Sequence, residues 1–208
     1  MYQNRYWDQL SQELTVLNDV SETLKTLLEN NVKELPSNSV TFDSPSDFQE
    51  RGSTGLSLFL YKVAENPDFK NQESQPADSD KLQYKPLTLD LYYLLTPFAH
   101  NRDAELVILS KIMRIFHDNA ILSSSSIKTS LVESGNKELR VVLNDISLEQ
   151  LNNLWSTFPE TPYKLSVSYL ITPIQIPSER VLKIKRVIQK QTDYFYKKDK
   201  DLKEEQKD

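Results

Sequence analysis

Alternating apolar residues in two stretches, 88–97 and 164–173, predict two matched β-strands. The apolar residues are Leu89, Leu91, Tyr93 and Leu95 in the first stretch and Leu165, Val167, Tyr169 and Ile171 in the second. Because a strand sends successive side chains to opposite faces, each stretch presents one apolar stripe. Both stretches end in Thr-Pro, and proline has no N–H for a ladder, so we expect both strands to stop there. The chain is therefore predicted to be built around a sheet.

Three other segments are predicted to be helices. In residues 8–29 and again in residues 103–119, apolar side chains recur every three or four positions and form one stripe. The stripe of the second segment is broad, which indicates heavy burial. A shorter helix is predicted over 148–158, because Ser147 is a favoured N-cap residue and Glu149 lies in the first turn.

Four further segments are predicted to be extended. Residues 56–63 have the composition of a strand, and residues 39–42 form a shorter extended piece. Residues 127–132 and 139–143 are predicted to be two strands around a hairpin-style turn at 134–136. Together with the helices, these strands predict the α+β class, with a single mixed β-sheet flanked by helices.

Two segments are too polar for a core. Residues 65–85 are predicted to form a loop, and a loop of that length is usually functional or disordered. The chain changes character at residues 178–208: apolar residues keep a helical spacing over 181–188, and residues 197–208 are almost wholly charged. We therefore expect a domain over 1–177, followed by a charged C-terminal helix and a frayed tail.

Composition narrows the class of protein. Apolar residues make up 38% and charged residues 26% of the 208 positions, which suits a soluble globular protein. The net charge of −5 provides no basic field for nucleic acid, and the lack of cysteine excludes thiolate chemistry. The N-terminus lacks the layout of a signal peptide, and no apolar run approaches the ~20 residues of a membrane span. We expect a cytoplasmic protein.

Candidate catalytic residues are few. His100 and His117 lie far apart in sequence and show no partner spacing. Residues 51–55 look superficially like a phosphate loop but lack its full pattern, and the chain has only three glycines. Asp78 and Asp80 lack the glycine and distal glutamate of a calcium loop. We therefore predict no enzymatic activity, no cofactor and no metal.

For two charged features, a structural interpretation is simpler than a functional one. Asp90 lies on the polar face of its predicted strand, where Lys164 is the simplest cross-strand partner. The C-terminal segment is locally basic at Lys183, Lys185, Arg186 and Lys190. Such a segment could contact nucleic acid, an anionic membrane or an acidic groove on a protein. Acidic neighbours dilute it, so a solvated helix face is favoured.

Four segments in order resemble the DUF4255 family. The matching segments are residues 86–97 as its hallmark strand, 58–71 as its strand and following loop, 154–158 as its closing helix, and 162–173 as its last strand. The segment 58–71 has a lysine where arginine is expected. The resemblance spans about residues 10–176, most of the chain.

That family is similar to cap, or tail-terminator, proteins of phage-tail-like contractile injection systems of the antifeeding prophage and Photorhabdus virulence cassette types. The resemblance implies a non-enzymatic, hexameric ring that closes the tube and sheath opposite the baseplate, without nucleic acid or membrane insertion. Such a protein is cytoplasmic during assembly and can leave the cell in a released particle. Contacts with tube, sheath or neighbouring subunits are predicted at Asn66, Phe69, Lys70, Asn71, Lys183, Lys185, Arg186 and Lys190.

Two other classes of function compete with this hypothesis. A monomeric adaptor could bind linear peptides at an exposed sheet edge, since a free strand accepts another. It would stay monomeric, whereas a ring former would oligomerise or co-purify with tube protein. A hydrolase would need a pocket with two acids of perturbed pKa, and the sequence offers no candidate pair.

Overall fold

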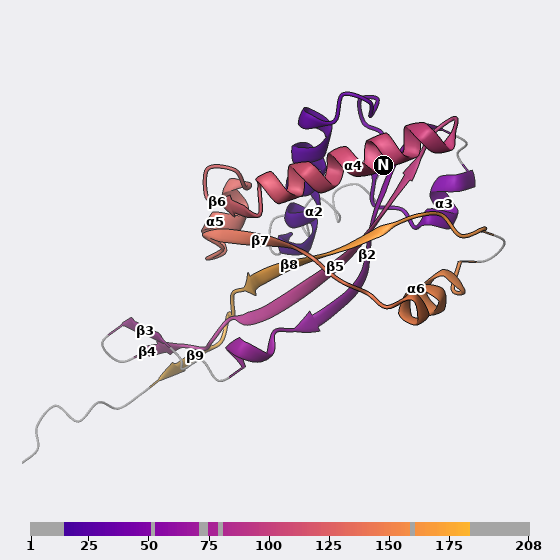
Figure 1. Cartoon of the computed structure of the whole chain (residues 1–208). Helices are drawn as coiled ribbons and strands as arrows, with labels where there is room; N and C mark the ends of the chain where they lie inside the picture. The colour runs from indigo at the N-terminus through magenta and orange to yellow at the C-terminus, as the bar shows by residue number, and fades with distance from the viewer. Residues whose placement is uncertain (1–14, 51–52, 71–74, 79–80, 159–160, 184–208) are drawn as a thin grey trace, which may run out of the picture.

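A mixed six-stranded sheet is the centre of the computed structural model, which describes residues 15–50, 53–70, 75–78, 81–158 and 161–183 (Figure 1). The strand order is β1 (Val40–Thr41), β2 (Gly55–Glu65), β5 (Leu87–Phe98), β8 (Val167–Ile176), β7 (Glu138–Leu143) and β6 (Ile121–Ser123). Strand β1 runs parallel to β2, and every other neighbouring pair is antiparallel. The α+β class with one mixed main sheet is confirmed.

The two matched strands pair directly with each other. Leu91 of β5 lies opposite Ile171 of β8, and Tyr93 lies opposite Tyr169. All four of these side chains are buried in the main hydrophobic cluster. The predicted apolar stripes therefore form the floor of the core, as their period of two requires.

Helices cover both faces of the sheet unequally. The main core lies under α2 (Val16–Asn31), α4 (Arg102–Asp118) and the short α5 (Thr129–Glu133). On the opposite face, α6 (Leu148–Trp155) packs Trp155 and the following Phe158 over Leu94 of β5. Much of that second face carries no helix (Figure 1).

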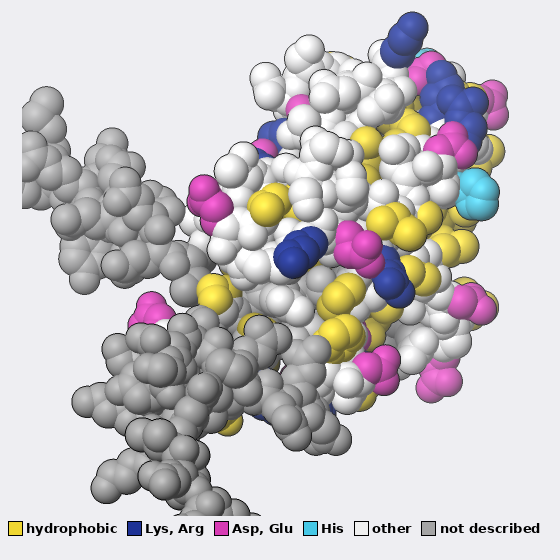
Figure 2. All heavy atoms as spheres, turned by 90° about the vertical axis from the view of Figure 1, so that its left-hand side faces the viewer, with side chains coloured by type: hydrophobic (Ala, Val, Ile, Leu, Met, Phe, Trp, Pro, Cys, Tyr) yellow, Lys and Arg dark blue, Asp and Glu magenta, His cyan; other side chains and the backbone are white. Residues whose placement is uncertain are grey.

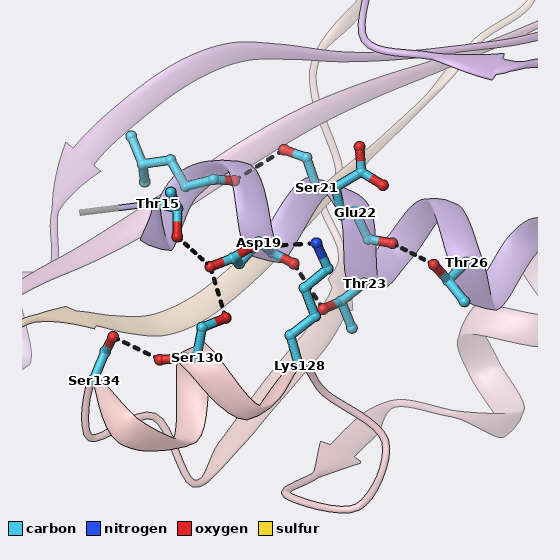
Figure 3. A network of polar contacts seen from close by, with 10 residues as sticks. Thr15, Asp19, Ser21, Glu22, Thr23, Thr26, Lys128, Ser130 and Ser134 are labelled. Carbon is cyan, nitrogen blue, oxygen red and sulfur yellow. Dashed lines mark hydrogen bonds and ion pairs between the residues drawn. The ribbon is translucent and has the colours of Figure 1, made fainter. Parts of the chain in front are cut away.

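The buried carboxylate of Asp19 links helix α2 to α5 through polar contacts (Figure 3). Asp19 is 6% exposed, and its Oδ2 accepts hydrogen bonds from Thr15 Oγ1 at 2.5 Å and Ser130 Oγ at 2.8 Å. Lys128 Nζ lies 3.3 Å from Oδ1. Burial raises the pKa of Asp19, but these hydrogen bonds outweigh it and leave the pKa below its ordinary value. The carboxylate therefore stays ionised.

The expectation that both strands stop at Thr-Pro is wrong, because β5 runs to Phe98 and β8 runs to Ile176. Pro97 lies opposite Leu56, whose N–H donates away from β5 to Ser39 O, so that pair needs no proline N–H. Pro97 also lies beyond Leu95, the last β5 residue paired with β8. Pro173 lies in an irregularity of register between β8 and β5. Both prolines thus occupy positions where the ladder does not need an N–H.

The predicted strand at 127–132 is also wrong, because that segment leads into helix α5. Ile127 and Leu131 stand four residues apart and are both buried, so the apolar pattern that fits a strand fits one helical turn equally well. The helix ends at Glu133, and Gly135 two residues later has φ +93°, a value that favours glycine. The edge strand beside β7 is instead β6, which sequence analysis missed.

Other boundaries differ in smaller ways. Sequence analysis missed α3 (Pro45–Glu50), which lies between the two predicted extended segments 39–42 and 56–63. Helix α2 continues to Asn31, and residues 8–14 of the predicted first helix lie outside the described residues. Helix α6 ends at Trp155, three residues earlier than predicted. None of the described helices is long and apolar enough to cross a membrane.

Candidate assembly surface

A small three-stranded sheet, here called the arm, projects from the end of the main sheet (Figure 1). It consists of β3 (Gln75–Asp78), β4 (Lys81–Gln83) and β9 (Val181–Lys183), in that order. Two expectations are corrected here: residues 65–85 are not a plain loop, and residues 181–183 are a strand instead of a helix. The helical spacing of the apolar residues did not decide their conformation, because pairing with β4 satisfies their backbone groups.

The arm brings together two segments that sequence analysis treated separately. Lys81 lies opposite Lys183 in the β4–β9 pair, and below it Tyr84 N–H donates to Arg180 O at 2.9 Å. The Arg180 guanidinium also lies 5.2 Å from the centre of the Tyr84 ring. The predicted loop 65–85 and the C-terminal segment that begins at residue 178 therefore meet in one structural unit, as far as residue 183.

A cleft of about 440 Å³ lies at the base of the arm. Its walls come from the ends of β2, β5 and β8 and are lined by Glu65, Asn66, Phe69, Tyr84, Lys85, Pro86, Leu87, Thr88, Ile176, Pro177 and Ser178. Thr88 is 4% exposed, and its hydroxyl has no hydrogen-bond partner among the described residues. No pattern in the sequence indicated this cleft, because its walls come from three separate segments.

The buried side chain of Asn66 holds the base of the arm through hydrogen bonds. It is 7% exposed and caps the short 3₁₀ helix η1 (Pro67–Phe69), where its Oδ1 accepts from Asp68 N–H at 2.9 Å. Its Nδ2 donates to Asp90 Oδ1 at 2.8 Å and to Thr172 Oγ1 at 3.1 Å. The expected pairing of Asp90 with Lys164 is wrong. Lys164 pairs with Glu105 at the start of α4.

The other predicted contact residues have different environments. Phe69 is half-buried in the wall of the cleft, and Lys70 is exposed and pairs with Glu65 at 3.4 Å. Lys183 lies in β9. The remaining four, Asn71, Lys185, Arg186 and Lys190, lie outside the described residues. Contact with a partner stays a prediction for all eight residues.

The side of the molecule that carries the arm presents charges of both signs between apolar patches (Figure 2). In the described part of the chain, no three His, Cys, Asp or Glu side chains gather so as to hold a metal ion. His100 lies between the end of β5 and the start of α4, and His117 lies in the last turn of α4, so the two histidines lie near opposite ends of that helix.

Solved structures share this fold. The sheath/tube terminator of PVC, an extracellular contractile injection system, matches in its extended state with a TM-score of 0.63 and 18% identity over 89% of this chain. The tube-terminating cap of the anti-feeding prophage matches with a TM-score of 0.57 and 17% identity over 84% of this chain. The matches cover 65% and 60% of those longer chains. The fold is therefore that of tube terminators.

The family follows from the sequence itself. The model of the Pvc16 N-terminal domain matches residues 19–190, and the chain belongs to that family. No curated protein matches the chain. The predicted relationship to terminators of contractile injection systems is confirmed at the level of family and fold.

Proposed function

We propose that this chain is a non-enzymatic structural cap that terminates the tube and sheath of a contractile injection particle at the end distal to the baseplate. The observation that carries the proposal is the shared fold with the PVC sheath/tube terminator over 89% of the chain, within the Pvc16 N-terminal domain family. Both structural neighbours are described as tube terminators.

The cap acts as a homo-hexameric ring. A closed ring requires heterologous contacts, in which two different surfaces of the same chain meet around the circle. The rigid sheet under α2 and α4 supplies the platform, and the arm supplies an extension that reaches other proteins. Residues 65–85 contact the tube or a neighbouring subunit, and residues 178–198 contact the sheath. Assembly takes place in the cytoplasm, and the finished particle is released, like the extracellular PVC system.

Electron microscopy of labelled particles tests this function. The chain is expressed with a small C-terminal tag together with its tube and sheath proteins, and the particles are decorated with gold against the tag. We expect gold at one end only, opposite the baseplate. Gold along the whole sheath, gold at the baseplate end or unlabelled particles would overturn the proposal.

Removing most of the arm tests where the cap makes its contacts. Deletion of residues 68–82 removes β3 and two residues of β4, and none of the residues whose burial the structure describes in the main core lies in this stretch. We expect the thermal unfolding midpoint to stay close to the wild-type value, while particle length becomes more variable. A Gly/Ser replacement of the same length is the matched control for chain connectivity. Particles of normal length and full capping in both variants would refute a contact role for the arm.

A further inference from the structure

The outer edge of β2 is free over most of its length. Strand β1 pairs with β2 only at Leu56 and Ser57, and no other described strand extends that edge. Leu56 donates its N–H outward to Ser39 O, and Asn66 donates its N–H inward to Thr88 O. Since backbone groups alternate along a strand, the backbone of residues between Leu58 and Glu65 presents unpaired groups at this edge.

The opposite side of the sheet ends in a second free edge. Strand β6 pairs with β7 only at residues 138–140, and Val141 N–H donates outward to Ala120 O. Asn144 N–H donates inward to Ser168 O. The backbone of Leu143, which lies between these two positions, therefore faces outward, and no described strand covers it.

Both free edges lie at the same level of the sheet. One row of opposed residues runs from Leu60 through Tyr93 and Tyr169 to Leu143, and the next row runs from Lys62 through Tyr92 and Leu170 to Val142. Strands β2, β5, β8 and β7 alternate in direction, so β2 and β7 run antiparallel. A second copy placed beside the first in the same orientation therefore brings its β2 antiparallel to the free edge of β7.

The side chains at the two edges suit a contact between copies. Val63 is 45% exposed at the β2 edge, and Val142 and Leu143 are 45% and 54% exposed at the β7 edge. The exposed Lys62 adds a positive charge to the first edge, and the exposed Asp145 follows the second. In the rows above, Leu143 of one copy lies level with Leu60 of the next, so the contact there is apolar, and Val142 lies level with Lys62, whereas Asp145 lies further along the edge.

We propose that the free edge of β2 in one copy pairs with the free edge of β7 in the next copy, so that main sheets join side by side around a ring. This inference rests on the ring in the proposed function and names the two surfaces that close it. The contact is heterologous, because residues near Lys62 meet residues near Val142 and never their own equivalents.

Cysteine cross-linking tests the pairing without background, since the natural chain contains no cysteine. The double variant Lys62→Cys/Val142→Cys is oxidised as purified full-length chain and in assembled particles. A disulfide requires Cα atoms about 4.4–6.8 Å apart, so a flexible bismaleimide is used in parallel to tolerate a shifted register. We expect a ladder of cross-linked species that ends in a closed ring, and no cross-link in either single variant.

Two controls identify the geometry. A mixture of the single variants gives dimers only, and the pair Leu106→Cys/Val142→Cys gives no ladder, because Leu106 is equally exposed but lies on helix α4. Cross-links within a single variant would show a two-fold contact and overturn the proposal. The absence of any ladder from both preparations would also overturn it. Gold labelling at one particle end would in that case leave the proposed cap function standing.

Discussion

A buried pair of hydroxyl groups offers a quantitative test of how α2 is held on the sheet. Ser21 Oγ of α2 lies 2.7 Å from Tyr93 Oη of β5, and Tyr93 is fully buried. Ser21 also donates a hydrogen bond to Leu17 O at 3.0 Å. Because this bond uses the single serine proton, the Tyr93 hydroxyl is the donor between the two.

This direction makes the two deletions unequal. Ser21→Ala leaves the Tyr93 hydroxyl buried without an acceptor, and an unsatisfied buried donor costs about 2 kcal/mol. Tyr93→Phe removes the donor itself and leaves Ser21 bonded to Leu17 O, so the expected cost is about 1 kcal/mol. The double variant has no stranded donor, and its expected cost is about 1 kcal/mol, well below the sum of the two single costs.

Urea unfolding of the wild type and the three variants measures this cycle. We expect unchanged m-values and midpoints that rank wild type above Tyr93→Phe and the double variant, with Ser21→Ala lowest. Additive effects, or a larger loss for Tyr93→Phe than for Ser21→Ala, would refute the donor assignment.

The same tyrosine predicts how stability responds to high pH. Burial raises the pKa of Tyr93 to about 12, although the hydrogen bond with Ser21 acts in the opposite direction. A raised pKa in the folded state means that the stabilisation is complete below the ordinary tyrosine pKa of 10.0 and is lost as the pH rises towards 12. Tyr93→Phe removes this part of the alkaline destabilisation, which urea midpoints at pH 9 to 11 would show.

Two further predictions concern other parts of the core. Gly55→Ala places a Cβ 2.4 Å from Ser39 O, a backbone atom, so we expect a loss of about 3 kcal/mol, whereas Ser53→Ala at an exposed neighbouring position stays near zero. Equal midpoints for the two variants in thermal unfolding would contradict this packing. Asp19→Asn weakens the link to Lys128 and destabilises by about 2 kcal/mol at pH 7. Because the pKa of Asp19 is lowered, the difference from wild type shrinks as the pH falls below about 3.8, and a constant difference in acid would count against it.

Local patterns predicted the strands that carry an apolar stripe along one face. The stripes through Leu91 and Ile171 identified β5 and β8, because the residues of one face recur at every second position. The predicted cap was also correct: Ser147 Oγ accepts from Gln150 N–H at 3.2 Å, and Gln150 Oε1 accepts from the Ser147 backbone N–H at 3.1 Å. Ile127 was misassigned, because a single turn of helix and a short strand share the same apolar pattern over five residues.

Pairing between distant segments explains what the sequence did not reveal. The arm forms because β4 meets β9 about a hundred residues later, and short polar strands carry no alternation that identifies a partner. The free edges of β2 and β7 are equally hidden in the sequence, because an edge is defined by the strands that do not pair with it. Backbone groups left unpaired at an edge favour association with another strand, and native sheets usually shorten, cover or charge such edges. Here β2 extends eight residues, from Leu58 to Glu65, beyond Ser57, the last residue that pairs with β1. Only Lys62 and Glu65 in this stretch are charged. In the pairing proposed above, a strand of the neighbouring subunit would cover this edge.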